Sequence, residues 1–205
     1  IYFTIEMDSR SIMQRICSIG TGVPYGRLRT QTMSVTEWQK VAEWWSKRYV
    51  DGMSRMAEYN VDRNFGKLHK VLKTSHELLP TQQLDIVYDP ALTLSRIRAE
   101  LDKKVRVIDT GVIIVDYINQ VQRSAIPSRG GQYDWTEQIE VSKALKTMAQ
   151  EFNVTVVSPY QIDGSGEARF AKGILDAADA AFIIDAHDHA DSCMTLDCVK
   201  MRNNS

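Results

Sequence analysis

The sequence predicts an α/β domain whose central sheet is mostly parallel and flanked by helices. Runs of β-branched residues alternate along the chain with amphipathic, helix-like segments, which is the pattern of parallel strands joined by crossover helices. The run 112–115 is Val-Ile-Ile-Val without a polar break, as expected for a central strand covered on both faces. With 205 residues, 43% of them hydrophobic, the chain is long enough to bury the core of one domain.

The N-terminal segments predict a strand and two helices. A strand is expected over residues 1–6 and a helix over 9–20, which Gly20 can end. A second amphipathic helix is predicted over 34–50, where Ser34 and the Glu three residues later have the spacing of a capping box. Helical spacing places these residues on the apolar faces of the two helices: Ile12, Ile16 and Ile19 on the first, and Trp38, Val41, Trp45 and Tyr49 on the second.

The middle of the chain interrupts this alternation and then resumes it. Residues 50–84 are polar and weakly periodic, and we interpret them as a helical insertion. A strand is expected over 84–88, followed by a helix that reaches Leu101. We expect Asp89 to be the N-cap of this helix and Pro90 its first residue.

The last third predicts one long helix, three strands and two loops. The helix covers 136–152, with Asp134 and Glu137 able to cap it, and a buried strand over 153–161 follows. Its buried stripe is expected to be Val141, Leu145, Met148 and Phe152. The remaining segments are two Gly-containing basic loops, 122–135 and 163–173, and two strands, 180–186 and 196–202.

Composition excludes several classes of protein. The formal net charge of -1 gives no bulk attraction for nucleic acid, so any such contact must come from locally clustered Arg and Lys. The apolar runs are too short to cross a bilayer, and no signal peptide is recognisable. Cys17, Cys193 and Cys198 are an odd, widely spaced set that suits a reducing compartment, so we expect a soluble cytoplasmic protein.

Three polar residues stand at the carboxyl ends of predicted core strands. They are Glu6, Asp116 and Gln161, and open α/β sheets bind ligands at that edge. An acid directly after an apolar strand can hold Mg²⁺ near a phosphate, a second acid can deprotonate water, and a glutamine can sense a γ-phosphate. Alternatively, each acid is only a solvated strand end.

Six segments carry a pattern that extends along the chain. In chain order they are "FTIEM", "GRLRT", "VIIVDY", "EVSKALKTMAQEFNVTVVSPYQ", "EARFAKGILDAADAAFII" and "VKMRN". They resemble, in this order, segments of the motor domain of the DnaB-type replicative helicases, a branch of the RecA-like ATPases. The matches run from Ile1 to Asn203, interrupted near 50–84, and the resemblance implies a RecA-like P-loop NTPase core.

By position, the resemblance assigns roles at the ATP site. Glu6 matches the general base, Asp116 the carboxylate that holds Mg²⁺ through water, and Gln161 the γ-phosphate sensor. Lys200 and Arg202 match a lysine and an arginine finger that reach the nucleotide of a neighbouring subunit. The resemblance therefore implies ATP and Mg²⁺ as cofactors and a ring of identical subunits, expected to be a hexamer.

The resemblance also implies single-stranded DNA as a partner. Arg169, Phe170 and Lys172 match the loop that follows the DNA backbone, and Arg123 and Arg129 are further candidates in the loop after Asp116. Solvated loop charges are the alternative interpretation of each arginine. The implied protein is an ATP-dependent helicase that moves 5′ to 3′ and works with a primase and a helicase loader, in a bacterium or a phage-infected cell.

The chain departs from the family pattern at two places. The phosphate-binding pattern G-x-x-x-x-G-K-[ST] does not occur, since Gly66-Lys67 is followed by Leu68. We therefore expect that the sequence begins just after this loop, as a truncated domain without activity of its own. Tyr160 stands where the family usually has Ser before the sensor glutamine.

Three other interpretations remain open at this stage. The chain could be a RecA-like recombinase or signalling ATPase that uses the same core without unwinding duplexes. It could also be a degenerate RecA-like module that only binds partners. Finally, five residues near the C-terminus could hold Zn²⁺: His187, His189, Asp191, Cys193 and Cys198.

Overall fold

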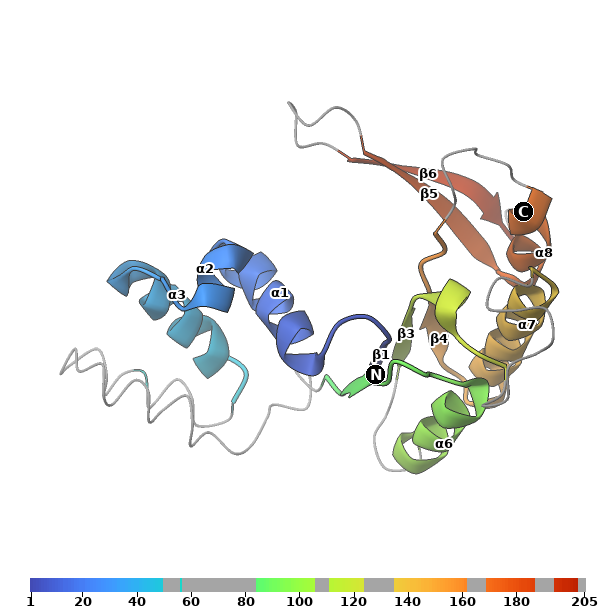
Figure 1. Ribbon diagram of the computed structural model, residues 1–205, viewed down its shortest axis with the longest axis horizontal. Coiled ribbons are helices and arrows are strands. Elements are labelled where there is room, and N and C mark those ends of the chain that lie inside the picture. Colours follow the sequence, from blue (N-terminus) through green and yellow to red (C-terminus); the bar gives the residue numbers. More distant parts are fainter. Residues whose placement is uncertain are drawn as a thin grey trace. The chain divides into compact units, whose positions relative to one another are not determined.

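The computed structural model describes residues 1–49, 56, 84–105, 111–123, 135–161, 169–186 and 194–202. Its contacts divide the chain into two compact units (Figure 1). We call Ile1–Ile5 with Asp89–Ser205 the sheet unit, and Glu6–Tyr88 the helical unit.

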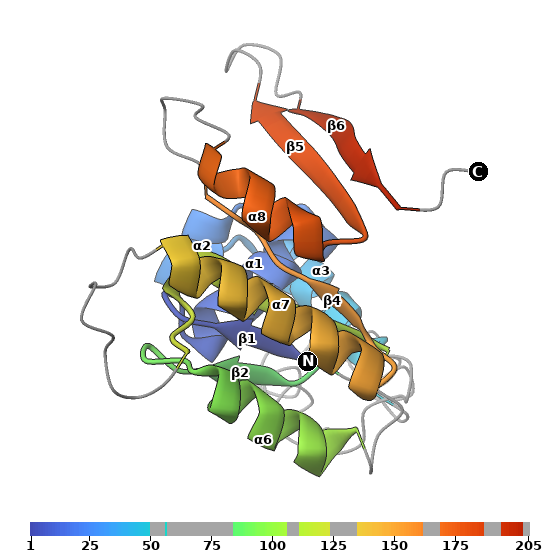
Figure 2. The same cartoon turned by 90° about the vertical axis from the view of Figure 1, so that its right-hand side faces the viewer.

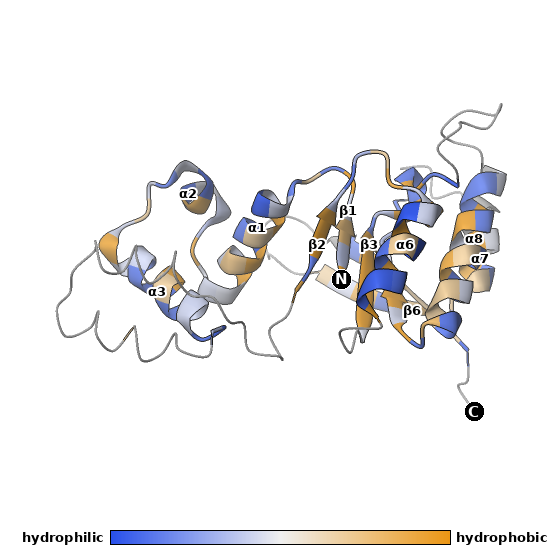
Figure 3. Cartoon of the chain, turned by 90° about the horizontal axis from the view of Figure 1, so that it is seen from below, coloured by the Kyte–Doolittle hydropathy of each residue, from blue (hydrophilic) through white to orange (hydrophobic). Residues whose placement is uncertain are grey.

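Parallel strands form the centre of the sheet unit, which confirms the predicted α/β class. The strands β1 (Tyr2–Thr4), β3 (Val112–Asp116) and β4 (Thr155–Val157) lie in the order β1-β3-β4. All their pairings are parallel, and β3 is central, as predicted. Figure 3 shows β1 and β3 in hydrophobic colours.

Burial of the strands is less complete than the sequence suggests. Ile113 and Val115, on one face of β3, are fully buried, whereas Val112 is 49% exposed. Val157 on β4 is 50% exposed, so the prediction of a buried strand there is wrong. In the described part of the chain, β4 is an edge of the parallel sheet, because β5 (Ala180–Ala186) pairs antiparallel with β6 (Met194–Met201) instead.

Helices α6 (Leu94–Lys104), α7 (Trp135–Glu151) and α8 (Arg169–Ala177) and the short 3₁₀ helix η2 (Ile118–Gln120) complete the sheet unit. Figure 2 shows α8 beside α7, and the two helices are in contact. Ser142 on α7 donates a hydrogen bond of 3.1 Å to the carbonyl of Ile174 on α8. The predicted stripe on α7 is buried at Val141, Leu145 and Met148, and only partly at Phe152.

The start of α6 differs from the prediction. Its N-cap is Thr93, whose hydroxyl accepts the N–H of Arg96 at 3.2 Å. Asp89 Oδ1 instead accepts the N–H of Ala91 at 2.9 Å, which is a local turn that competes with helix formation. The predicted start at Asp89 and Pro90 is therefore wrong by four residues, because Leu94 is the first helical residue.

The helical unit contains α1 (Ser9–Thr21), α2 (Tyr25–Thr30), α3 (Val35–Ser46) and the strand β2 (Ile86–Tyr88). Gly20 does not end α1, contrary to prediction. The helix ends at Gly22, which has a φ of 70°, a conformation that favours glycine. Gly20 has a packing role, since a Cβ there would lie 2.1 Å from Nε1 of Trp44.

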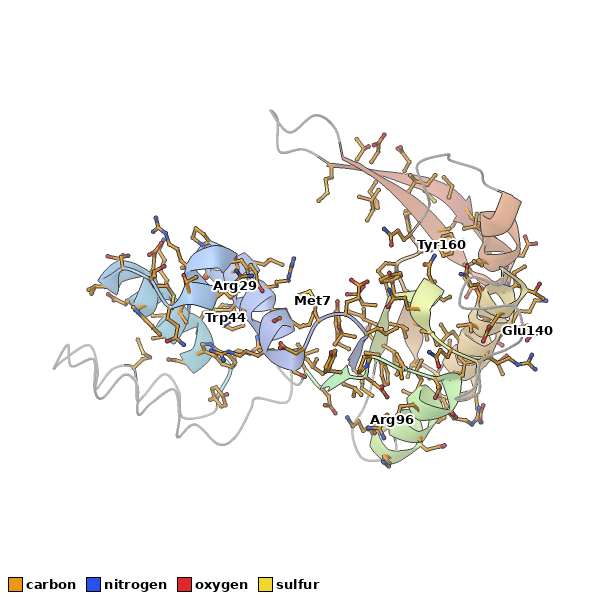
Figure 4. All side chains as sticks on the ribbon, in the orientation of Figure 1. Met7, Arg29, Trp44, Arg96, Glu140 and Tyr160 are labelled. Carbon is orange, nitrogen blue, oxygen red and sulfur yellow. The ribbon has the colours of Figure 1, made fainter. Side chains whose placement is uncertain are left out.

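The capping box at the start of α3 is confirmed. The hydroxyl of Ser34 accepts the N–H of Glu37 at 3.3 Å, and Oε2 of Glu37 accepts the N–H of Ser34 at 2.8 Å. The helix ends at Ser46, so Tyr49 is not part of it, and Ile19 on α1 is 86% exposed rather than apolar core. Trp44, labelled in Figure 4, packs with Trp45 against a core of Cys17, Val23, Leu28 and Val41.

The predicted helical insertion at 50–84 lies outside the described residues, except for Met56 and Leu84.

Candidate functional site

The end of β3 places Asp116 beside the end of β1. Thr4 is the register partner of Asp116, and the N–H of Ile5 donates to the Asp116 carbonyl at 3.2 Å. Glu6 follows Ile5 in the chain and is exposed, but it belongs to the helical unit. The sheet unit by itself therefore brings together Asp116 and Gln161 of the predicted ATP-site residues.

Tyr2 holds the carboxylate of Asp116. Its hydroxyl donates to Oδ2 of Asp116 at 2.6 Å. Tyr2 pairs with Ile114, and Asp116 lies two residues further along β3 on the same face, within reach of a long side chain. No motif signals this contact, because it depends on the register of the two strands.

The donor chemistry of Asp116 fits Mg²⁺. This ion is usually held in proteins by one or two carboxylates, with phosphate and water oxygens supplying the rest. Asp116 offers one partly buried carboxylate at the edge where parallel strands end. Among the described residues, no group of three or more His, Cys, Asp or Glu side chains is close enough to hold a metal by itself.

Asn119 clamps the backbone of Gln161. Its Nδ2 donates to the Gln161 carbonyl at 3.0 Å, and its Oδ1 accepts the Gln161 N–H at 3.0 Å. The Ser158 hydroxyl also donates to the carbonyl of Val115, directly before Asp116, at 2.6 Å. These hydrogen bonds join the segments that follow β3 and β4. The sequence analysis did not identify Asn119.

Tyr160, labelled in Figure 4, lies in the segment between β4 and Gln161. Its hydroxyl is 3.5 Å from Oε1 of Gln138 on α7. Tyr160, which departs from the family pattern, therefore faces α7, while Asn119 binds the backbone of Gln161.

Of the two predicted DNA contacts after Asp116, the structure describes Arg123. Its N–H donates to Glu137 Oε1 at 3.1 Å, and its guanidinium forms an ion pair with Glu140, so both contacts are with acids near the start of α7. Its side chain is 63% exposed. Arg129 lies outside the described residues.

Arg169, Phe170 and Lys172 belong to the first turn of α8 and not to a loop, contrary to prediction. The physical reason is local composition, because residues 167–172 contain no Gly or Pro and include several good helix formers. Gly173 does not break the helix. It permits close packing on α7, since a Cβ there would lie 2.3 Å from Cδ1 of Ile139.

Lys200 and Arg202 lie against the C-terminal turn of α8. Lys200 Nζ donates to the carbonyls of Leu175 at 2.5 Å and Asp176 at 3.2 Å. Arg202 donates to the Asp176 carbonyl at 3.0 Å and to Oδ1 of Asp179 at 3.3 Å. Carbonyls at a helix C-terminus lack partners within the helix and attract cations, which explains why both side chains settle there.

Asp179 is surrounded by positive charge. Its Oδ2 forms an ion pair with Lys146 of α7, and its Oδ1 faces Arg202. The hydrogen bond from Lys146 is the main cause that lowers the pKa of the Asp179 carboxyl, and the charges of Arg202 and Lys200 act in the same direction. An open pocket of about 390 Å³ adjoins this cluster, lined by Lys143, Lys146 and Arg202 among others.

The possible zinc ligands fall mostly outside the described residues, since 187–193 are not described. Cys198 lies on β6, where its side chain is exposed and not in a disulfide. In the described part of the chain, no helix is long and apolar enough to cross a membrane.

The family match and the two sequence relatives described here are all replicative helicases or their domains. Residues 1–174 match the family of DnaB-like helicase C terminal domains. The chain is 25% identical over 170 residues to the "Replicative DNA helicase DnaB" of Rickettsia bellii (strain RML369-C), covering 82% of this chain and 27% of that protein. It is 22% identical over 173 residues to the "Probable replicative DNA helicase" of Trieres chinensis, covering 84% of this chain and 30% of that protein.

Two solved structures share the fold. A DnaB-like replicative helicase, described together with its interactions with primase, superposes with a TM-score of 0.67 at 13% identity, covering 98% of this chain and 45% of that one. A second structure, of an isolated ATPase domain, gives a TM-score of 0.66 at 15% identity, covering 98% of this chain and 66% of that one. The family match stops at residue 174, before Lys200 and Arg202.

Proposed function

Since this chain belongs to the family of DnaB-like helicase C-terminal domains, we propose that it is part of an ATP-driven motor that translocates on single-stranded DNA and unwinds duplex. The observation that supports the proposal within the structure is the tie between the segment that follows β3, which Asp116 ends, and the segment that carries Gln161, made by Asn119 and Ser158. The chain spans 27% and 30% of the two relatives compared above, so the activity proposed is that of the whole gene product.

The proposed chemistry is hydrolysis of ATP. Asp116, steadied by Tyr2, holds Mg²⁺ through water. When bound, this ion neutralises charge on the phosphates. Glu6 accepts a proton from the attacking water, and Gln161 responds to the presence of the γ-phosphate. Since Gln161 is exposed and its backbone is fixed, its side chain can turn toward a ligand without moving the strand ends.

The proposed assembly is a hexameric ring of identical subunits. Lys200 and Arg202 act on the nucleotide of a neighbour, where their charges offset charge on the transferring phosphoryl group. The Arg202 side chain is 50% exposed, which leaves part of the guanidinium open to a neighbour. A primase is proposed as a further partner, since one structural neighbour was described with primase. A helicase loader is proposed from the family resemblance alone.

The proposed DNA contacts are the arginines and lysine identified from the family resemblance. Arg169, Phe170 and Lys172 begin α8, and Arg123 and Arg129 follow β3. Their positive charges would screen backbone phosphates, and the phenyl ring of Phe170 offers a stacking surface for a base.

ATP turnover of the full gene product, with and without single-stranded DNA, tests the proposal. Glu6→Gln and Arg202→Ala are each expected to abolish DNA-stimulated turnover while leaving the protein folded. Arg98→Ala is a matched control, because Arg98 lies on α6, where it forms an exposed ion pair with Glu151 and a ring contact with Phe152. Normal turnover in both site variants would rule out the proposed motor and favour a module that only binds partners.

A further inference from the structure

The last turn of α8 and Asp179, which follows it, hold Arg202 at three points. Its backbone N–H donates to the Asp179 carbonyl at 2.7 Å, and its guanidinium donates to the Asp176 carbonyl and to the Asp179 carboxylate. Backbone and side chain are therefore fixed by the same few residues. A long arginine side chain at the end of a strand would otherwise sample many rotamers.

The carboxylate that holds Arg202 is itself fixed from the opposite side. Oδ2 of Asp179 forms an ion pair with the ammonium of Lys146, and Oδ1 forms one with Arg202. Lys146 belongs to α7, which is packed on α8, so the orientation of the carboxylate is set by the fold and not by Arg202. Charge-assisted contacts of this kind are directional as well as strong.

We propose that Asp179 is a positioning residue for Arg202: it fixes one edge of the guanidinium against α8 and presents the remaining N–H donors to a phosphate of a neighbouring copy of this chain. The proposal rests on the proposed function, in which Arg202 acts across the subunit boundary. A guanidinium has enough donors to bind a carboxylate and a phosphate at once. Its half-exposed side chain leaves the second of these positions open.

The test compares two Asp→Asn variants of the full gene product. Asp179→Asn keeps the size of the side chain but removes the charge that orients Arg202. We expect the kcat of DNA-stimulated ATP hydrolysis to fall about tenfold, with KM for ATP nearly unchanged, since charge-assisted hydrogen bonds are the stronger class. Asp197→Asn is the matched control, because Asp197 is an exposed residue of β6 that takes no part in the contacts of Arg202 described above.

Lys146→Met separates positioning from packing. It removes the ion pair between α7 and Asp179 but leaves Arg202 beside the carboxylate. Its kcat should fall less than that of Asp179→Asn. If Lys146→Met and Asp179→Asn lose kcat equally, and in proportion to a loss of thermal stability, the effect passes through helix packing and the inference is overturned.

Arg202→Ala in the same assay separates this inference from the proposed function. If Arg202→Ala abolishes turnover and Asp179→Asn behaves as wild type, the positioning role is wrong while the trans-acting role stands. If Arg202→Ala leaves turnover intact, the trans-acting role proposed for Arg202 fails, and the inference fails with it.

Discussion

Replacing Asn119 by alanine removes the two hydrogen bonds that hold the backbone of Gln161. Each such bond contributes about 0.5–1.5 kcal/mol net, so the upper bound for the pair is about 3 kcal/mol. Gln161 is exposed, and water can replace part of what is lost. We therefore expect Asn119→Ala to reduce the free energy of unfolding by about 1–2 kcal/mol. The proposed γ-phosphate response should weaken with it, because the backbone of the responding residue is no longer fixed.

Urea unfolding and DNA-stimulated ATP turnover of the full gene product measure the two effects. Asn119→Asp is an informative second variant, because one carboxylate oxygen can still accept the Gln161 N–H while the bond to the Gln161 carbonyl is lost. The other carboxylate oxygen would repel the Gln161 carbonyl, so the loss of unfolding free energy should be at least as large as that of Asn119→Ala. Gln39→Ala removes one exposed side-chain hydrogen bond on α3 and should change neither measurement. An Asn119→Ala variant with an unchanged unfolding midpoint and unchanged kcat would refute the clamp.

Three further outcomes follow from single contacts. Gly20→Ala should destabilise the protein by about 1–3 kcal/mol, since the new Cβ meets Trp44 at 2.1 Å, and an unchanged thermal midpoint would contradict this packing. Tyr2→Phe should raise the Mg²⁺ concentration needed for half-maximal ATP turnover, because Asp116 loses its 2.6 Å partner, and an unchanged magnesium titration would argue against that role. The lowered pKa of Asp179 means that its stabilising contribution is complete above 3.8, the ordinary value, and is lost as pH falls through the folded-state pKa. In Asp179→Asn, the free energy of unfolding should therefore fall less steeply as the pH is lowered than in the wild type. The same decrease in both proteins would argue against the ion pair.

Local signals in the sequence were sufficient where a few neighbouring residues decide the structure. The capping box at Ser34 and Glu37 was predicted and is formed, because both partners lie within one turn. The run at 112–115 was correctly placed as the central strand, because β-branched residues without polar alternation are typical of a central strand in a parallel sheet.

Predictions failed where two local structures compete or where packing decides. Asp89 can cap a helix or form a tight turn, and in the structure it accepts the N–H of Ala91 in a turn while Thr93 caps α6. Gly20 resembles a helix stop, but the indole of Trp44 needs the space that glycine leaves. In both cases the deciding contact is not visible from neighbouring residues.

The candidate site also contains residues that local sequence signals suggest and residues that they do not. Asp116 and Gln161 became candidates because each lies after a predicted apolar strand, and the structure ties the segments that follow β3 and β4 together; their roles stay predictions. Tyr2, Asn119 and Asp179 were missed because their roles depend on strand register or on contacts between distant segments. Residues that orient others carry no motif, since their requirement is one of position and not of chemical type.

A short helix connects the two groups of residues for which different roles are proposed. Arg169 is the first residue of α8 and Asp176 the last but one, so about 11 Å of rigid helix separates the proposed DNA contact from the carbonyl that holds Lys200 and Arg202. If DNA bound at Arg169, the proposed DNA contact, displaces that end of α8 and the helix moves as a rigid body, the carbonyl that holds Lys200 and Arg202 moves with it. Stimulation of hydrolysis by DNA then requires no separate signalling element, only the packing of α8 on α7.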